Sequence, residues 1–149
     1  MKTILVAIDF SSVTPLLLDE AVAMARAFDA SIRLIHVAPP DPDFVGYEPG
    51  PHTVRETVAD ELRADHRRLH KLEGEVQEKG VAASSLFIQG PTVEKLLQAA
   101  VETGAELIVM GSHGHGALHH LLVGSVSEGV LRDAPCPLLL VPSPRGNHA

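Results

Sequence analysis

The chain has 149 residues, of which 45% are hydrophobic, and its 12 Lys and Arg against 19 Asp and Glu give a formal net charge of −7. This length is enough for one domain with its own hydrophobic core. Because binding to nucleic acid or to anionic membranes needs clustered Lys and Arg, the acidic balance argues against both kinds of partner. A small anionic ligand is still compatible with this charge, since backbone amides can bind one.

The cysteine content and the first residues both favour the cytoplasm. Cys136 is the single cysteine and has no partner for an internal disulfide, which fits a reducing compartment. Asp9 interrupts the apolar segment 4–8 after five residues, so this segment is too short for a secretory signal. We also expect no membrane-spanning segment, because no window of about 18 apolar residues occurs.

Short apolar segments alternate along the chain with stretches in which apolar residues recur at helical spacing. The segments typical of buried strands cover residues 4–8, 31–37, 84–89, 107–110 and 137–141. The helical stripes consist of Leu17, Ala21, Met24 and Phe28, then of Val54, Val58, Leu62, Leu69, Leu72 and Val76, and then of Val93, Leu96, Leu97, Ala100 and Val101. A fourth helix is expected from Gly124 to about Arg132.

Capping residues mark several predicted helix ends. Thr14, followed by Pro15, is the expected cap of the first helix, and Thr92 is the expected cap of the third. Gly80 and Gly104 are expected to end the second and third helices. The segment 38–51 contains five of the eleven prolines and is too long for a simple connection, so a lid over a ligand is one possible role.

The alternating order predicts an α/β fold with one five-stranded, parallel, doubly wound sheet and helices on both faces. In such sheets a ligand binds outside the carboxyl ends of the strands, where the winding direction reverses. The loops after the first and fourth strands, at residues 9–12 and from Gly111 onwards, are therefore the expected binding region.

The segment 111–125 is rich in glycine and has no formally charged residue. Gly124 and Ser125 fall where a helix begins, so N–H groups and a hydroxyl are available to an anion such as phosphate. A P-loop is excluded, because no lysine follows Gly111, and so is a dinucleotide fingerprint, because the spacing is G-x-x-G-x-G after the fourth strand. A simple turn is the alternative interpretation of this segment.

The glycine spacing also resembles the signature of a known family. Gly111 and Gly114 are followed, after nine residues, by Gly124, Ser125 and the apolar Val126. This pattern resembles the nucleotide-binding signature of the universal stress protein family. The resemblance extends over nearly the whole chain, through the family's first strand with its acidic loop, its second strand, its third loop and its final strand, at residues 4–11, 34–37, Gly90 and 135–142.

The resemblance implies a single domain over residues 1–149, with a Rossmann-like or flavodoxin-like fold of the adenine nucleotide alpha hydrolase type. It also implies an ATP site, with Mg²⁺, in the crevice between the first and fourth strands. By position, the residues expected at the nucleotide are Ala7, Ile8 and Asp9 in the adenosine-contacting loop, Val37 in the adenine pocket, Met110 and Gly111 beneath the nucleotide, His113, Gly114 and His115 in the following loop, and Gly124, Ser125 and Val126 around the phosphates. The family often has a basic or polar residue where His115 stands, so phosphate affinity is expected to be weaker, or to rise on acidification.

Two of these residues also have purely structural interpretations. Asp9 could cap the following helix, and Ser125 could be an N-cap, a role that is compatible with contact to phosphate.

Nine histidines raise the further alternative of a metal site. The pairs with usable ligand spacing are His113 with His115, His119 with His120, and His66 with His70. They have no cysteine or clear acidic partner nearby in sequence, so we predict no metal site, and we expect Cys136 to be a small buried hydrophobe rather than a redox switch.

The fifth predicted strand, between Pro137 and Val141, would leave an apolar sheet edge bare. Members of the family commonly dimerise through this strand, so the resemblance implies a homodimer. The charges of both signs on the long second helix are typical of a solvated face and not of a nucleic-acid interface.

Three functions stay open at this point. The favoured one is an ATP-binding regulatory module that acts in the stress response on an unknown downstream protein. The second is a slow ATPase or autophosphorylating protein, although the glycine-rich loop has no Lys or Arg and no catalytic residue can be assigned. The third is a nucleotide-free scaffold, against which the intact glycines argue.

Overall fold

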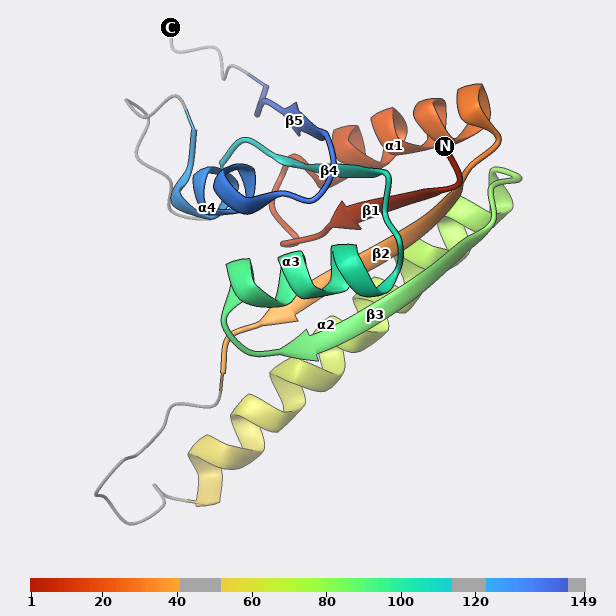
Figure 1. The fold of residues 1–149 in the computed structure, drawn as a ribbon. Helices are drawn as coiled ribbons and strands as arrows, with labels where there is room; N and C mark the ends of the chain where they lie inside the picture. Colours follow the sequence, from red (N-terminus) through yellow and green to blue (C-terminus); the bar gives the residue numbers. More distant parts are fainter. Residues whose placement is uncertain (41–51, 114–122, 145–149) are drawn as a thin grey trace, which may run out of the picture.

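A computed structural model describes residues 1–40, 52–113 and 123–144, with only the backbone described for 52–55. Strands and helices alternate strictly within these ranges (Figure 1). The order is β1 (Thr3–Ala7), α1 (Thr14–Phe28), β2 (Ser31–Ala38), α2 (His52–Glu78), β3 (Ala83–Gln89), α3 (Thr92–Glu102), β4 (Leu107–Gly111), α4 (Ser125–Asp133) and β5 (Leu138–Val141). Each predicted strand overlaps an observed one, and their ends differ by at most one residue.

All neighbouring strands are parallel, and their order in the sheet is β3-β2-β1-β4-β5. The chain moves outward from β1 through β2 to β3 and then returns to the other side of β1 with β4 and β5. The winding direction therefore reverses between β1 and β4, which is where such sheets bind ligands. The predicted doubly wound α/β sheet is confirmed.

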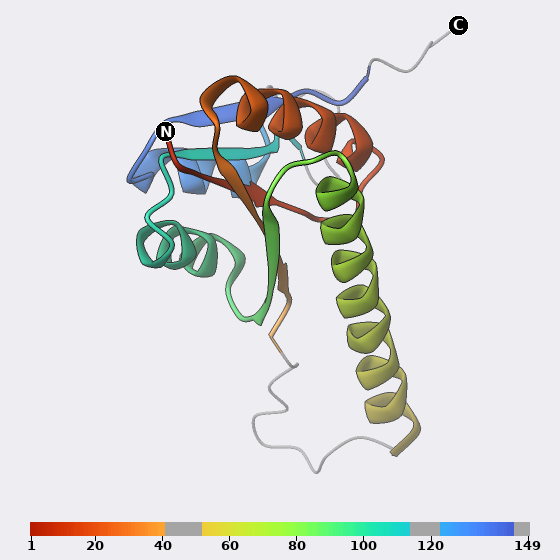
Figure 2. The same ribbon diagram turned by 90° about the vertical axis from the view of Figure 1, so that its right-hand side faces the viewer.

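Successive residues of the central strands face opposite sides of the sheet, as the pleat requires. Ile4 and Val6 belong to the core beneath α1 and α2, which includes Leu17 and Leu69. Leu5 belongs to the second core, beneath α3 and α4. Figure 2 shows the two pairs of helices on opposite sides of the sheet, with α2 beginning well beyond the ends of β2 and β3.

Both predicted threonine caps are wrong by one position. Thr14 and Thr92 are the first residues of α1 and α3, the caps are Val13 and Pro91, and neither helix start has a side-chain capping bond. Thr14 Oγ1 is buried and has no hydrogen-bond partner among the described residues, so this hydroxyl caps no backbone N–H. Gly80 and Gly104 have positive φ values of 81° and 64°, as expected of residues that end helices.

Two residues of the predicted helical stripes are exposed. Phe28 is the last residue of α1 and is 50% exposed, because the chain turns away at Asp29 in a left-handed conformation. Val101 is 68% exposed on α3, whose buried residues are Leu96, Ala99 and Ala100. Val101 lies about 140° around the helix from Leu96, at 100° per residue, and so points away from the sheet.

Candidate functional site at the ends of β1 and β4

The predicted site residues converge on the carboxyl ends of three adjacent strands. Ala7 ends β1 and Gly111 ends β4, and these two strands pair directly, with Val6 opposite Val109. On the other side of β1, Val37 lies near the end of β2. Val37 and Met110 are 9% and 4% exposed and belong to the same core, beneath α3 and α4. The loops after β1 and β4 therefore leave the sheet side by side.

The loop after β1 is held by local hydrogen bonds. The Ile8 N–H donates to the Ile35 carbonyl at 2.8 Å, which extends the pairing of β1 with β2 by one residue. The Ser11 N–H then donates to Asp9 Oδ1 at 2.9 Å. The carboxylate of Asp9 thus stabilises its own loop, and α1, capped by Val13 with no side-chain bond, begins further along. The interpretation of Asp9 as the cap of α1 is wrong.

A histidine that the sequence analysis did not single out contacts this loop. His36, on β2, is 9% exposed, and its Nδ1 lies 2.7 Å from the Ile8 carbonyl oxygen. Its ring is also 4.6 Å from the ring of Phe10, whose φ is 58°. The signal in the sequence was a polar residue inside the apolar run of the second strand.

Close packing at the end of β4 explains the glycine at position 111. A Cβ there would lie 3.2 Å from Val13 Cγ1 and 3.3 Å from the His113 carbonyl oxygen. Gly111 thus lets the start of α1 approach the end of β4, which brings the two loops into contact. The Gly111 carbonyl also accepts a hydrogen bond from Ser127 Oγ at 2.7 Å, and this bond ties α4 to the strand.

Further backbone bonds hold the start of α4 at the same place. The Ser112 N–H donates to the Val141 carbonyl at 3.0 Å, and the Gly124 N–H donates to the Ser112 carbonyl at 2.7 Å. Ser112 Oγ lies 3.0 Å from His113 Nδ1. The beginning of α4 is therefore fixed to the end of β4 by contacts that do not depend on any ligand.

The first two residues of α4 are open to solvent, between the buried Gly124 and Ser127. Gly124 is the N-cap, with φ −71° and ψ 163°, so Ser125 is the first helical residue and not the cap that its alternative interpretation proposed. Ser125 and Val126 are exposed, and no side-chain capping bond is formed at this end. The first N–H groups of a helix have no acceptor within the helix and carry partial positive charge, so they can bind an anion. Gly114 and His115 lie outside the described residues.

A family model for the universal stress protein family matches residues 1–142 of the chain. The chain belongs to the universal stress protein family. A universal stress protein of Thermus aquaticus is 36% identical over 142 residues, which are 94% of this chain and 98% of that protein. Universal stress protein YxiE of Bacillus subtilis is 33% identical over 142 residues, with 92% and 96% of the two chains covered. The resemblance stated from the glycine spacing is therefore confirmed.

Solved structures of universal stress proteins share the fold. A crystal structure from Burkholderia pseudomallei matches with a TM-score of 0.72 and 32% identity, over 95% of this chain and 96% of that one. Two others carry a nucleotide. One, a universal stress protein in complex with cAMP, has a TM-score of 0.64 and 23% identity over 94% and 95% of the chains. The other, from Archaeoglobus fulgidus in complex with dAMP, has a TM-score of 0.64 and 18% identity over 94% and 97%.

His66 and Cys136 both pack against apolar or aromatic neighbours in the described part of this universal stress protein. No group of three or more His, Cys, Asp or Glu residues that could hold a metal ion occurs there, and His66 contacts the ring of Phe87 at 5.4 Å. Cys136 is partly buried against the core beneath α3 and α4, and this burial raises the pKa of its thiol. Among the described helices, none has the length and apolar character needed to cross a membrane.

Proposed function

We propose that this universal stress protein binds ATP, with Mg²⁺, between the loops that follow β1 and β4. In this proposal residues 1–149 act as one domain, as a homodimeric regulatory module of the stress response in the cytoplasm. The observation that carries the proposal is the exposed start of α4, at Ser125 and Val126. It is fixed to the end of β4 by the Gly124–Ser112 bond and lies beside the strand whose following loop carries Asp9.

The phosphates would be bound by main-chain amides. Gly111 to Leu131 contains no Lys or Arg, so the amides of Ser125, Val126 and Ser127 and the dipole of α4 would supply the positive potential. Asp9 is the one acidic side chain that the resemblance places at the adenosine, where it would accept hydrogen bonds from ligand hydroxyls. Val37 and Met110, in one apolar core at the strand ends, would pack against the base.

The choice of an adenine nucleotide is supported by the related structures with cAMP and dAMP. ATP is chosen over a monophosphate because the resemblance implies an ATP site, with Gly114 close to the ribose and phosphate and Gly124, Ser125 and Val126 around the phosphates. Mg²⁺ is included because triphosphates carry it. It would be held by the phosphates with few protein ligands, as is common for this ion.

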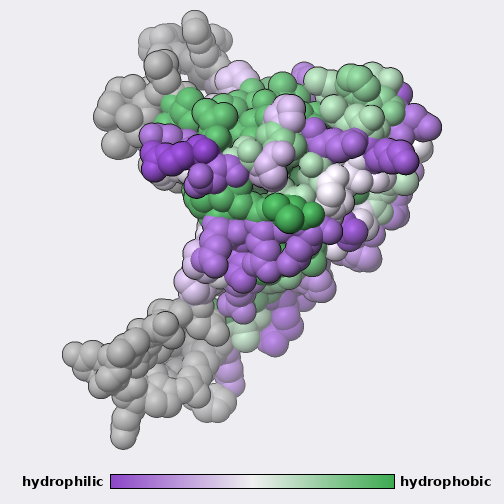
Figure 3. Space-filling model, viewed as in Figure 1, coloured by the Kyte–Doolittle hydropathy of each residue, from purple (hydrophilic) through white to green (hydrophobic). Residues whose placement is uncertain are grey.

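The proposed dimer would form along β5. This strand is at the edge of the sheet and pairs with β4 on one side. Leu138, Leu139 and Leu140 are partly exposed, and apolar surface gathers over the β4–β5 side of the molecule in Figure 3, above the polar outer face of α3. A second copy paired along β5 would cover an edge that proteins rarely leave bare.

The binding proposal can be tested on the purified protein. Heat denaturation should release an adenine nucleotide that chromatography identifies, and calorimetry on nucleotide-free protein should detect ATP in the presence of Mg²⁺. The Asp9→Ala variant should weaken this binding. An empty protein that also fails to bind ATP at millimolar concentration would contradict the proposal. Steady release of phosphate that Asp9→Ala abolishes would favour the slow ATPase instead. The proposed dimer can be tested separately by light scattering, which measures the molar mass in solution.

A further inference from the structure

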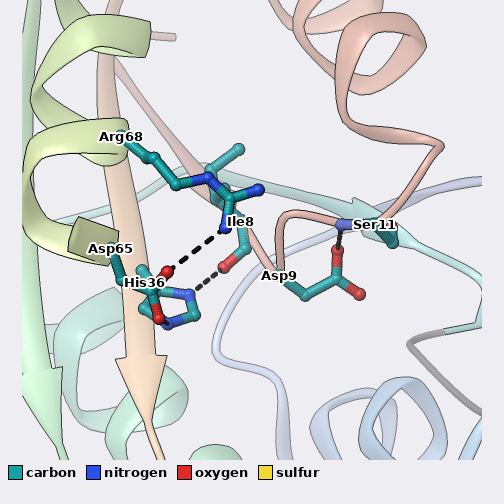
Figure 4. Close-up of polar contacts among 6 residues, drawn as sticks. All are labelled: Ile8, Asp9, Ser11, His36, Asp65 and Arg68. Atoms are coloured by element: carbon teal, nitrogen blue, oxygen red, sulfur yellow. Dashed lines mark hydrogen bonds and ion pairs between the residues drawn. The ribbon is translucent and has the colours of Figure 1, made fainter. Parts of the chain in front are cut away.

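The imidazole of His36 lies at the end of the pairing between β1 and β2. Ala7 pairs with Ile35, so His36 is next to Ile8, the first residue beyond β1. Nδ1 of His36 lies 2.7 Å from the Ile8 carbonyl oxygen (Figure 4). A carbonyl oxygen can only accept a hydrogen bond, so Nδ1 must carry the proton. The ring therefore fixes the direction in which the chain leaves the sheet.

The same ring also contacts the residue on the other side of Asp9. Phe10 packs on His36 with ring centroids 4.6 Å apart and planes inclined by 43°. Its φ of 58° lies in the left-handed region, which a bulky residue adopts only where its surroundings stabilise it. Both sequence neighbours of Asp9 are thus held by one imidazole, Ile8 through its carbonyl and Phe10 through its ring.

Helix α2 approaches the imidazole from the other side. Nε2 of His36 lies 4.0 Å from Asp65 Oδ2, and Asp65 Oδ1 accepts a hydrogen bond from Arg68 at 3.2 Å. The guanidinium of Arg68 in turn lies 4.2 Å from the centre of the Phe10 ring. These four side chains form a closed circuit that joins α2 and β2 to the loop after β1. Phe87 of β3 packs beside the imidazole at 5.5 Å.

We propose that His36 is the positioning residue of the nucleotide loop. It sets the backbone of Ile8 and the carboxylate of Asp9 in the arrangement that receives the nucleoside, and the rings of Phe10 and Phe87 pack beside its imidazole. His36 binds the Ile8 carbonyl in the structure, so it would act on a ligand through this loop. The proposal rests on the proposed function, since it concerns the affinity of that same site.

Two substitutions separate positioning from a general structural role. His36→Asn places an amide N–H near the position of Nδ1, from which it can still donate to the Ile8 carbonyl. His36→Gln places its amide near Nε2 and leaves that carbonyl without its donor. Both remove the ring, so the pair is matched for lost packing. His70→Gln, the same change at a histidine with a 78% exposed side chain, is the control.

We expect His36→Gln to weaken ATP binding about tenfold in calorimetry, because the loss of one buried hydrogen bond has an effect of about this size. His36→Asn should weaken ATP binding less than about threefold, because its amide keeps the bond. His70→Gln should leave binding unchanged. A structural role alone would lower the unfolding midpoint of both variants equally and leave the dissociation constant of the folded protein unchanged. Equal affinities in the two variants would overturn the proposal.

A second readout keeps the positioning role separate from nucleotide binding. Hydrogen exchange of the Phe10 and Ser11 amides should be about tenfold faster in His36→Gln than in His36→Asn, with or without nucleotide. If the wild type binds no nucleotide, the proposed function fails, while the exchange rates still decide whether His36 orders the loop. If neither variant folds, ¹⁵N NMR of the wild-type His36 imidazole at neutral pH shows which ring nitrogen carries the proton, and the proposal requires a proton on Nδ1. A ring protonated only on Nε2 would overturn the proposal.

Discussion

Helices α1 and α4 begin at the carboxyl ends of two adjacent strands, yet their first turns differ. In α1 the cap, Val13, is 2% exposed, Thr14 is 7% exposed, and Pro15 offers no N–H. In α4 the cap is a glycine, and the next two residues, Ser125 and Val126, are exposed. The cap and first residue of α1 are therefore buried in the core, whereas the first two residues of α4 face solvent behind a buried glycine cap.

The difference shows what a helix N-terminus needs in order to bind an anion. Both helices have the same backbone dipole, but only amides that reach the surface can donate to a ligand. Val13 fills the space in front of α1 by packing against Gly111. In the proposed site, α1 would therefore supply a packed wall and α4 the N–H donors.

The largest expected effect contrasts a leucine from each helix. Leu17 on α1 is 1% exposed, whereas Leu131 on α4 is 55% exposed. Leu17→Ala should lower the free energy of unfolding by about 2–5 kcal/mol, because it leaves a cavity in the core. Leu131→Ala should change it by less than about 0.5 kcal/mol. Urea unfolding measures both, and equal losses would show that α1 is not the more deeply anchored helix.

The contact between the two loops can be broken at Gly111. Gly111→Ala places a methyl group 3.2 Å from Val13 Cγ1 and should lower the free energy of unfolding by about 1–3 kcal/mol through overpacking. Gly74→Ala is the matched control, since nothing lies within 4 Å of a Cβ there. In the interior of α2 it should stabilise the protein by about 0.5–1 kcal/mol in the same urea titration. A neutral Gly111→Ala would mean that α1 can move away from β4 without cost.

Gly124 tests the donors of α4. Its φ of −71° is open to any residue, so Gly124→Val should keep the circular dichroism spectrum, but the glycine is buried and the larger side chain should lower the free energy of unfolding by about 1–3 kcal/mol. The isopropyl group would stand in front of the first amides, and we expect ATP affinity to fall at least about tenfold. Calorimetry measures this loss. A collapse of the fold would show that this glycine serves the architecture alone.

The smallest expected effect is a gain in stability at the start of α1. Thr14 Oγ1 is buried and has no hydrogen-bond partner among the described residues. Thr14→Val keeps the shape of the side chain and removes this unpaired hydroxyl, so it should raise the free energy of unfolding by about 1 kcal/mol. Ser127→Ala is the contrasting variant, because its hydroxyl is bonded to the Gly111 carbonyl at 2.7 Å. It should lower the stability in the same thermal or urea scan.

The strands and the fold class were predictable because their signals are local. A run such as 31–37 matches the observed Ser31–Ala38, since β-branched apolar residues bounded by loop residues describe a strand buried on both faces. The glycine spacing was equally readable and led to the family. The threonine caps were wrong, because the entry of a chain into a helix depends on how it leaves the preceding strand. The prediction that Val101 is buried was wrong, because the apolar stripe of this helix is wider than the face that α3 turns to the sheet.

The sequence by itself determined which residues are apolar, how often they recur and where glycine interrupts them. This was enough to predict the alternating fold and to propose Asp9 and Gly124 as residues of a ligand site. Only the tertiary structure decided which surfaces meet. His36 binds the carbonyl of Ile8, which is 28 residues away in the sequence. Val13, near the start of the chain, packs against Gly111. Hydrophobic periodicity records that a side chain is buried but not against what, so contacts between distant segments appear only once the sheet has assembled.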